Sequence, residues 1–265
     1  MGSDVTIVEY HDRVLARLDP DAGTLLRERF EQEGIRVLVN ANSERAERAG
    51  SGVRIHLTSG QTLAADRLLV ATGRRPNVHG LGLEQLGIEV TERGITVDDR
   101  LRAGSGIWAL GDAAGVGLLT HLGKYQARVA AANIAGLDMT ADYRAIPAAV
   151  FTDPQVATVG VMDGDGIVTV RYEIVGGRLS TYERPRRPAF LKLAADAGRR
   201  VLVGAVAVGP EAGEWLGQLT LAVRARVPLD VLLDTIQPYP TFSESIFGAL
   251  RELEDALDGV RTHAG

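Results

Sequence analysis

The sequence of 265 residues contains no cysteine, which excludes a disulfide, a thiolate metal site and a cysteine nucleophile within it. No apolar run approaches the roughly 18 residues of a membrane-spanning helix, and the first residues do not have the pattern of a signal peptide. We therefore expect a cytoplasmic protein without membrane contact, and we assign no metal-ligating residue. Basic residues form no block and the net charge is −5, which argues against nucleic acid as a partner.

The composition is that of an ordinary globular protein, with 45% hydrophobic and 24% charged residues. This length accommodates one large domain or two smaller ones, each with its own core.

The first 71 residues alternate strand-like and helix-like patterns. A β-branched run at 5–9 predicts a buried parallel strand, a helix is expected over 22–33, and a second strand over 35–39. A hairpin follows at 53–64, and the apolar run 68–71 predicts another buried strand. The order indicates an α/β nucleotide-binding arrangement.

A phosphate-binding glycine loop is missing from this arrangement. A complete unit begins with a strand and Gly-x-Gly-x-x-Gly at a helix start, and an acidic residue ends the next strand, where Glu9 stands. The segment Gly115-Val116-Gly117 lacks the third glycine. The pattern therefore corresponds to the part of a nucleotide-binding unit that follows its glycine loop.

A second nucleotide-type pattern lies at 107–115. The run 107–110 predicts a short buried strand that ends at Gly111 and Asp112, and a helix is expected over roughly 123–135. A nucleotide binds at such strand ends in open α/β sheets, and the carboxylate can accept hydrogen bonds from sugar-like hydroxyls. Gly-Asp after a strand is also ordinary turn chemistry.

Residues 137–150 resemble a linker into a second unit that is richer in strands. Within this unit we expect four strands, at 155–161, 167–172, 189–194 and 201–208. We also expect three helices, at 211–227, 229–235 and 243–257. We expect Trp215, Leu216, Leu219 and Val223 to face inward from the first helix, and Ile246, Phe247, Leu250 and Leu253 from the last.

Three segments together resemble the flavin-dependent pyridine nucleotide-disulfide oxidoreductases, the family of lipoamide dehydrogenase, glutathione reductase and mercuric reductase. They are 71–77 (Ala-Thr-Gly-Arg-Arg-Pro-Asn), 107–112 (Ile-Trp-Ala-Leu-Gly-Asp) and 238–244 (Pro-Tyr-Pro-Thr-Phe-Ser-Glu). Their order and spacing match the latter part of such enzymes, and the resemblance covers nearly the whole sequence.

The resemblance implies an α/β fold: a partial Rossmann-like nucleotide-binding domain, followed by an α+β dimerisation domain with a mixed or antiparallel sheet. Residues 1–72 would be part of an NAD(P)-binding domain, 73–146 a central segment that completes the FAD site, and 147–265 the dimerisation domain. The FAD and NAD(P)H sites would both be incomplete in this sequence.

The resemblance also implies roles for residues near the flavin. Asp112 would bond the flavin ribityl chain, Gly111 would permit its close approach, and Leu119, Thr120 and His121 would line the isoalloxazine edge. The alternatives are a turn aspartate that caps the next helix and a surface histidine at a helix start.

Two residues are assigned to the nicotinamide side. Glu9 would accept hydrogen bonds from the adenosine ribose, which favours NAD over NADP unless Arg13 turns inward. The alternative is a solvated carboxylate at a strand end. Gly73 would mark a close approach to the nicotinamide or to the domain crossing, or it is a simple turn glycine.

At Tyr239 the sequence differs from the family members that react with thiols and disulfides. Those enzymes carry a histidine there, paired with a glutamate that Glu244 matches. Tyrosine has a reference pKa of about 10 and is a poor base at neutral pH. We assign Tyr239 and Glu244 as the catalytic pair, but thiol-disulfide chemistry of the histidine type is not expected. The alternative is a packed interface tyrosine whose hydroxyl bonds Glu244.

Several functional hypotheses therefore stand. The first is an oxidoreductase that passes hydride from NAD(P)H to FAD and then reduces a small acceptor, such as a quinone, as a homodimer through 147–265. A separate chain could supply the FAD-binding front part. The second is a non-catalytic dimerisation or partner subunit, and the third is a truncated gene product or a mis-set start codon.

Overall fold

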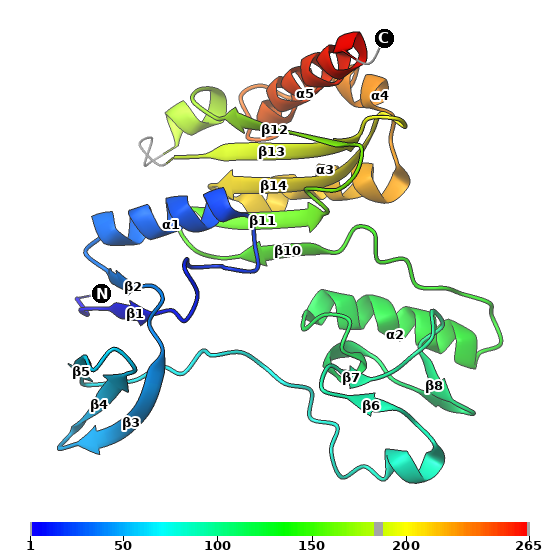
Figure 1. Ribbon diagram of the computed structural model, residues 1–265. Coiled ribbons are helices and arrows are strands. Elements are labelled where there is room, and N and C mark those ends of the chain that lie inside the picture. The colour runs from blue at the N-terminus through cyan, green and yellow to red at the C-terminus, as the bar shows by residue number, and fades with distance from the viewer. Residues whose placement is uncertain (1, 183–187, 264–265) are drawn as a thin grey trace. The chain divides into compact units, whose positions relative to one another are not determined.

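The computed structural model describes residues 2–182 and 188–263. The chain divides into two compact units: residues 1–69 together with 147–265, and residues 70–146 (Figure 1). None of the helices in the described ranges is long and apolar enough to cross a membrane.

Strands, singly or in runs, are separated by helices along the chain. The strands are β1 (Thr6–Val8), β2 (Arg36–Leu38), β3 (Ser43–Ala49), β4 (Gly52–Leu57), β5 (Thr62–Ala65), β6 (Val90–Thr91), β7 (Gly94–Ile95), β8 (Arg102–Gly104), β9 (Ile107–Trp108), β10 (Pro147–Val150), β11 (Gln155–Gly160), β12 (Ile167–Glu173), β13 (Phe190–Asp196) and β14 (Val201–Gly209). The helices are α1 (Pro20–Gln32), α2 (Thr120–Ile134), α3 (Ala212–Ala225), α4 (Leu229–Leu233) and α5 (Glu244–His263), with 3₁₀ helices at Leu83–Leu86 (η1), Gly111–Ala114 (η2) and Gly177–Thr181 (η3).

The first unit is built on a five-stranded antiparallel sheet in the order β10-β11-β14-β13-β12. A short turn around residues 198–200 joins β13 to β14 as a hairpin. One interpretation was wrong: residues 147–150 are not linker but the edge strand β10, paired with β11. The mixed α/β architecture with an antiparallel second sheet is confirmed.

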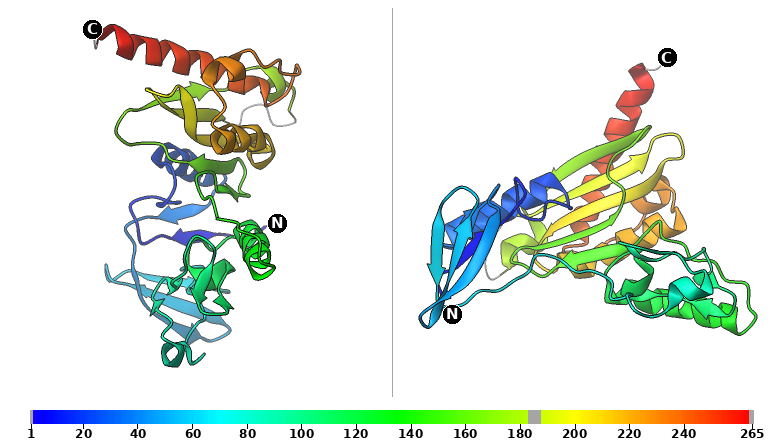
Figure 2. Two further views of the ribbon diagram at one scale, coloured as in Figure 1. Left: turned by 90° about the vertical axis from the view of Figure 1, so that its right-hand side faces the viewer. Right: turned by 60° about the horizontal axis from the view of Figure 1, so that its bottom comes forward.

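Helices flank this sheet because alternate side chains of each strand point to opposite faces. Val206 and Val208 of β14 pack with Ala22 and Leu25 of α1 in one buried cluster. Helix α3 contacts β11 and β14, and α5 runs along β12 and β13 (Figure 2). Helix α1 therefore attaches the nucleotide-type segment to the sheet.

An ion-pair cluster reinforces that attachment. Asp19 is the N-cap of α1 and accepts bonds from the N–H groups of Asp21 and Ala22. Lys192 on β13 places its Nζ 2.8 Å from Asp19 Oδ2 and 2.7 Å from Asp21 Oδ2. The hydrogen bond from Lys192 lowers the pKa of Asp21. Burial disfavours the charged form of Lys192, but the two carboxylates outweigh burial and raise its pKa.

The last helix differs from the prediction at one position. Ile246, Leu250 and Leu253 are buried as expected, whereas Phe247 is 41% exposed. Residues at 246, 250, 253 and 257 repeat with the helical period and form the buried stripe, and 247 lies beside it. The expected inward residues of α3 are all buried.

The nucleotide-type segment forms only part of a sheet. Strands β1 and β2 pair in parallel, with Thr6 opposite Arg36, and β3, β4 and β5 form a separate antiparallel meander. Within the described residues β1 has no second strand beside it. The expected buried strand at 68–71 is wrong: these residues are irregular and exposed, Leu69 at 88%. An apolar run becomes a buried strand only where a neighbouring strand pairs with it.

The second unit is small and has two cores. Val78, Ile88, Ile95 and Ala109 form one cluster, and α2 contributes to the other, which contains Leu101, Val129 and Ala130. The predicted strand 107–110 is confirmed only at Ile107–Trp108 (β9), and Leu110, which was expected to be buried, is 39% exposed.

Candidate functional site

Asp112 lies in η2, directly after the segment that begins with β9. Its Oδ2 is 2.9 Å from Nη2 of Arg74, and Nη1 of Arg74 donates to the carbonyl of Leu118 at 3.2 Å. Arg74 thus connects the segment after Gly73 to both η2 and the loop before α2. The Asp112 side chain is 42% exposed, so a ligand can reach the carboxylate.

Two of the candidate residues have backbone conformations that favour glycine. Gly73 has φ +121° and Gly111 has φ +64°, values that side chains with a Cβ rarely adopt. A Cβ on Gly73 would meet no atom within 4 Å, and one on Gly111 would approach only the Cα of Gly123, at 4.0 Å. Both glycines therefore border open space next to Asp112 or Arg74.

The other three candidates of this unit lie at the start of α2. Leu119 is the N-cap residue and provides no side-chain hydrogen bond to the helix. Thr120 begins the helix, and His121 is exposed at its second position. The second unit thus brings together the turn of Asp112, the Gly73–Arg74 segment and the N-terminus of a 15-residue helix.

Sequence reasoning missed one residue of this site, Gln126. It is fully buried on α2, accepts a hydrogen bond from the Gly111 N–H at 2.7 Å and donates one to the Tyr143 hydroxyl at 3.0 Å. Burial raises the pKa of Tyr143. A signal was present, because Gln126 falls on the helical stripe that contains Leu122 and Val129.

Glu9 follows β1 in the first unit. Its Oε1 accepts the His11 N–H at 2.8 Å, so the carboxylate is oriented by its own turn. Arg13 does not turn toward Glu9: its guanidinium contacts Asp12 and the carbonyl of Ala16. A second acceptor oxygen of Glu9 remains for a ligand hydroxyl.

Tyr239 and Glu244 lie in the segment before and at the start of α5. The Tyr239 ring is 77% exposed, and the described residues show no hydrogen bond between its hydroxyl and Glu244. The alternative of an interface tyrosine that is packed by a partner subunit and bonded to Glu244 stays a prediction. Glu244 Oε2 is buried, lies beside Gly177, and has no hydrogen-bond partner in the described part of the chain.

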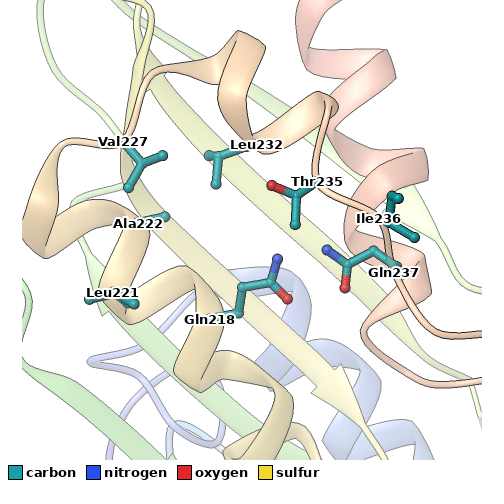
Figure 3. Close-up of a pocket in the computed structure, with 8 residues that line it drawn as sticks. All are labelled: Gln218, Leu221, Ala222, Val227, Leu232, Thr235, Ile236 and Gln237. Carbon is teal, nitrogen blue, oxygen red and sulfur yellow. The ribbon is translucent and has the colours of Figure 1, made fainter.

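An open groove of about 370 Å³ lies between α3 and the segment after α4 (Figure 3). Ala222, Val227 and Leu232 line one end, and polar groups line the other. Ile236 at its rim is 95% exposed. No cluster of side chains in the described ranges could hold a metal ion.

Residues 1–136 match the family described as pyridine nucleotide-disulphide oxidoreductase, and residues 146–249 match the dimerisation domain of the same enzymes. A dihydrolipoyl dehydrogenase of Thermus scotoductus is 34% identical over 266 residues, which is 96% of this chain and 57% of that protein. An NAD(P)H dehydrogenase (quinone) of Mycobacterium tuberculosis is 33% identical over 268 residues, 97% of this chain and 54% of that protein. The chain therefore spans about half the length of these curated relatives.

Solved structures agree with these matches. LpdA from Mycobacterium tuberculosis has a TM-score of 0.85 at 33% identity and covers 95% of this chain and 57% of its own. The Cu(II) complex of the HOCl-induced flavoprotein disulfide reductase RclA from Escherichia coli has a TM-score of 0.82 at 28% identity, with coverage of 98% and 59%.

Proposed function

The chain belongs to the pyridine nucleotide-disulphide oxidoreductase family. From this premise we propose that it is part of a flavin-dependent NAD(P)H oxidoreductase, and that it supplies the residues that contact the flavin ribityl chain and those that form the dimer. The observation that carries the proposal is the exposed Asp112 carboxylate between two glycine-bordered turns and the start of α2. Bound FAD would supply the chemistry, accepting hydride from NAD(P)H and passing electrons to a small acceptor.

The residues present fit a flavin. A carboxylate accepts hydrogen bonds from hydroxyl groups, as a ribityl chain offers. The first N–H groups of α2 receive no bond from the Leu119 side chain, and a helix N-terminus favours negative charge on a bound ring. In this proposal Gly111 permits the close approach, and Leu119, Thr120 and His121 line the ring edge.

For the nicotinamide nucleotide, we assign Glu9 to the adenosine ribose and Gly73 to the segment that passes the nicotinamide. Arg13 is bonded to Asp12 and to the carbonyl of Ala16, so its guanidinium is not directed at a 2′-phosphate beside Glu9. The arrangement favours NAD over NADP.

The proposed acceptor is a quinone or another small molecule, not a disulfide. Tyr239 stands where the resemblance implies a histidine, and a phenol with a reference pKa of about 10 is a poor base for thiols at neutral pH. The relative named as an NAD(P)H dehydrogenase (quinone) supports this acceptor class. Tyr239 and Glu244 would contact the acceptor or position it.

We further propose that a second copy of this chain covers the groove of Figure 3. The groove lies within the match to the dimerisation domain. Two apolar side chains that line it are exposed, Ile236 at 95% and Leu221 at 66%. In a two-fold dimer the same patch meets itself, so each Ile236 would be buried by the partner. An I236D variant should be monomeric in light scattering. A V175D variant, in which an exposed valine outside the groove is changed, should remain dimeric.

The open side of β1 supports a further partner. A parallel sheet of two strands is unusually small, and its unpaired edge can accept another strand. We propose that the FAD-binding front part, in the same polypeptide or a separate chain, supplies that strand. The division into 1–72, 73–146 and 147–265 and the cytoplasmic location remain predictions.

Flavin retention tests the proposed function. The chain is incubated with FAD, desalted, and examined by absorbance; the wild type should retain a flavin band that D112A loses. A D138A variant, which removes an exposed carboxylate paired with Arg100, should retain it. A wild type that dimerises but retains no flavin would instead favour the non-catalytic dimerisation subunit.

A further inference from the structure

Helix α2 carries two buried carboxamides, Gln126 and Asn133, which are the buried polar side chains of the described residues. A buried amide costs free energy unless its donors and acceptor are bonded. Asn133 bonds the carbonyls of Val129 and Met139 and ties the end of α2 to the chain that follows it. Gln126 instead reaches out to the turn that carries Asp112.

Gln126 supplies a hydrogen-bond acceptor that the Gly111 turn itself lacks. Gly111 is the first residue of η2, and the first N–H groups of a helix have no acceptor within it. Leu110, at the N-cap, has no side-chain acceptor to offer. Gln126 Oε1 takes that place at 2.7 Å, although it lies 15 residues further along the chain.

The other end of the Gln126 amide is also held. Its Nε2 donates to the Tyr143 hydroxyl at 3.0 Å, and the ring of Tyr143 meets the ring of Tyr125 edge-on. The Tyr125 hydroxyl in turn accepts the backbone N–H of Asp142 at 2.7 Å. The carboxamide is therefore fixed at both ends, and its oxygen points at Gly111.

We propose that Gln126 is a positioning residue for Asp112: by accepting the Gly111 N–H it holds the Gly111–Asp112 turn in the conformation that presents the carboxylate to a ribityl hydroxyl. This inference rests on the flavin site proposed above. Gly111 adopts a left-handed conformation, with φ +64°, that a turn without this bond would leave readily. A mobile turn would bind the hydroxyl less tightly, because ordering it costs conformational entropy on binding.

The test compares Q126L, Q126E and N133L in the full chain, with folding checked by circular dichroism. Leucine fills the space but removes the acceptor. The Q126E carboxylate keeps an acceptor for the Gly111 N–H and can accept the Tyr143 O–H. N133L is the matched control, since it removes the other buried amide of α2 without touching Gly111.

Two readouts are measured: riboflavin affinity by fluorescence quenching, and hydrogen exchange of the Gly111 amide by NMR in the flavin-free protein. Q126L should weaken riboflavin binding about tenfold and speed Gly111 exchange at least tenfold. Q126E, which keeps an acceptor for the Gly111 N–H, should speed Gly111 exchange less than Q126L does. N133L should leave both unchanged, even if it lowers stability.

Unchanged Gly111 exchange in Q126L would overturn the inference, as would an equal loss of riboflavin affinity in N133L. If Q126L binds riboflavin like wild type while D112N does not, the inference is wrong and the flavin site stands. If D112N binds like wild type, the flavin site itself is wrong, and Gly111 exchange alone decides whether Gln126 holds the turn.

Discussion

Replacing Lys192 by methionine should detach α1 from the five-stranded sheet more than any change at an exposed ion pair of the same helix. The Lys192 side chain is only 14% exposed, and Asp19 beneath it is 7% exposed. Methionine preserves most of the aliphatic stem but removes the charge that both carboxylates face.

The expected loss of unfolding free energy depends on the interactions that each carboxylate keeps in K192M. Removing one partner of a buried ion pair typically costs about 3–5 kcal/mol, because a charge is left uncompensated. Asp21 is 39% exposed and keeps Arg171, whose Nη1 lies 3.0 Å from its Oδ2, and Asp19 keeps its bonds from two backbone N–H groups. We therefore expect K192M to lower the free energy of unfolding by about 2–3 kcal/mol.

Urea denaturation, followed by the fluorescence of Trp215, measures this loss. A W108F background makes Trp215 the single tryptophan, since the sequence has two. The control is R27M, which breaks the exposed Arg27–Glu31 pair on α1 and should cost about 0.3–0.5 kcal/mol. A K192M loss below about 0.5 kcal/mol, or one equal to that of R27M, would refute the reasoning.

The remaining predictions concern pH and packing. The lowered pKa of Asp21 and the raised pKa of Lys192 mean that the stability difference between wild type and K192M is full between roughly pH 5 and 9. It should shrink as pH falls below the ordinary aspartate value of about 3.9 toward the lowered pKa of Asp21, and as pH rises above the ordinary lysine value of about 10.4 toward the raised pKa of Lys192. Urea titrations across pH check both ends, and a flat profile would contradict the cluster. G248A should lower the free energy of unfolding by about 1–3 kcal/mol, because its Cβ would lie 2.5 Å from the ring of Tyr172. G217A, whose Cβ would meet no atom within 4 Å, should instead raise it by about 0.5–1 kcal/mol in the same assay.

The parts of the fold that were predictable from sequence are those whose burial is set locally. The stripe of Trp215, Leu216, Leu219 and Val223 repeats with the helical period and is buried as expected. The apolar runs of β13 and β14 and the short turn between them likewise define a hairpin without reference to distant residues. The prediction that Phe247 faces inward was wrong because it relied on apolar character alone, whereas position 247 lies beside the buried stripe of the helix.

Other features depend on neighbours that local pattern does not reveal. The run 68–71 is as apolar as a buried strand, yet no strand pairs with it in the described residues. Gln126 appears as an ordinary polar residue until the fold brings Gly111 and Tyr143 against it. Asp112 and Gly111 were identifiable as a candidate site from the Gly-Asp motif. The helical stripe marks Gln126 as a buried position, but it does not show which turn Gln126 contacts.

The central claim is that Asp112 binds a ribityl hydroxyl, and comparison of riboflavin with lumiflavin tests it most directly. Lumiflavin has the same ring system but a methyl group in place of the ribityl chain. A hydrogen bond to a charged group is worth about 1.5–3 kcal/mol, so riboflavin should bind the wild-type chain at least tenfold more tightly than lumiflavin, and D112N should remove most of that preference. Equal affinities for the two flavins in the wild type, or a riboflavin preference that survives in D112N, would contradict the account.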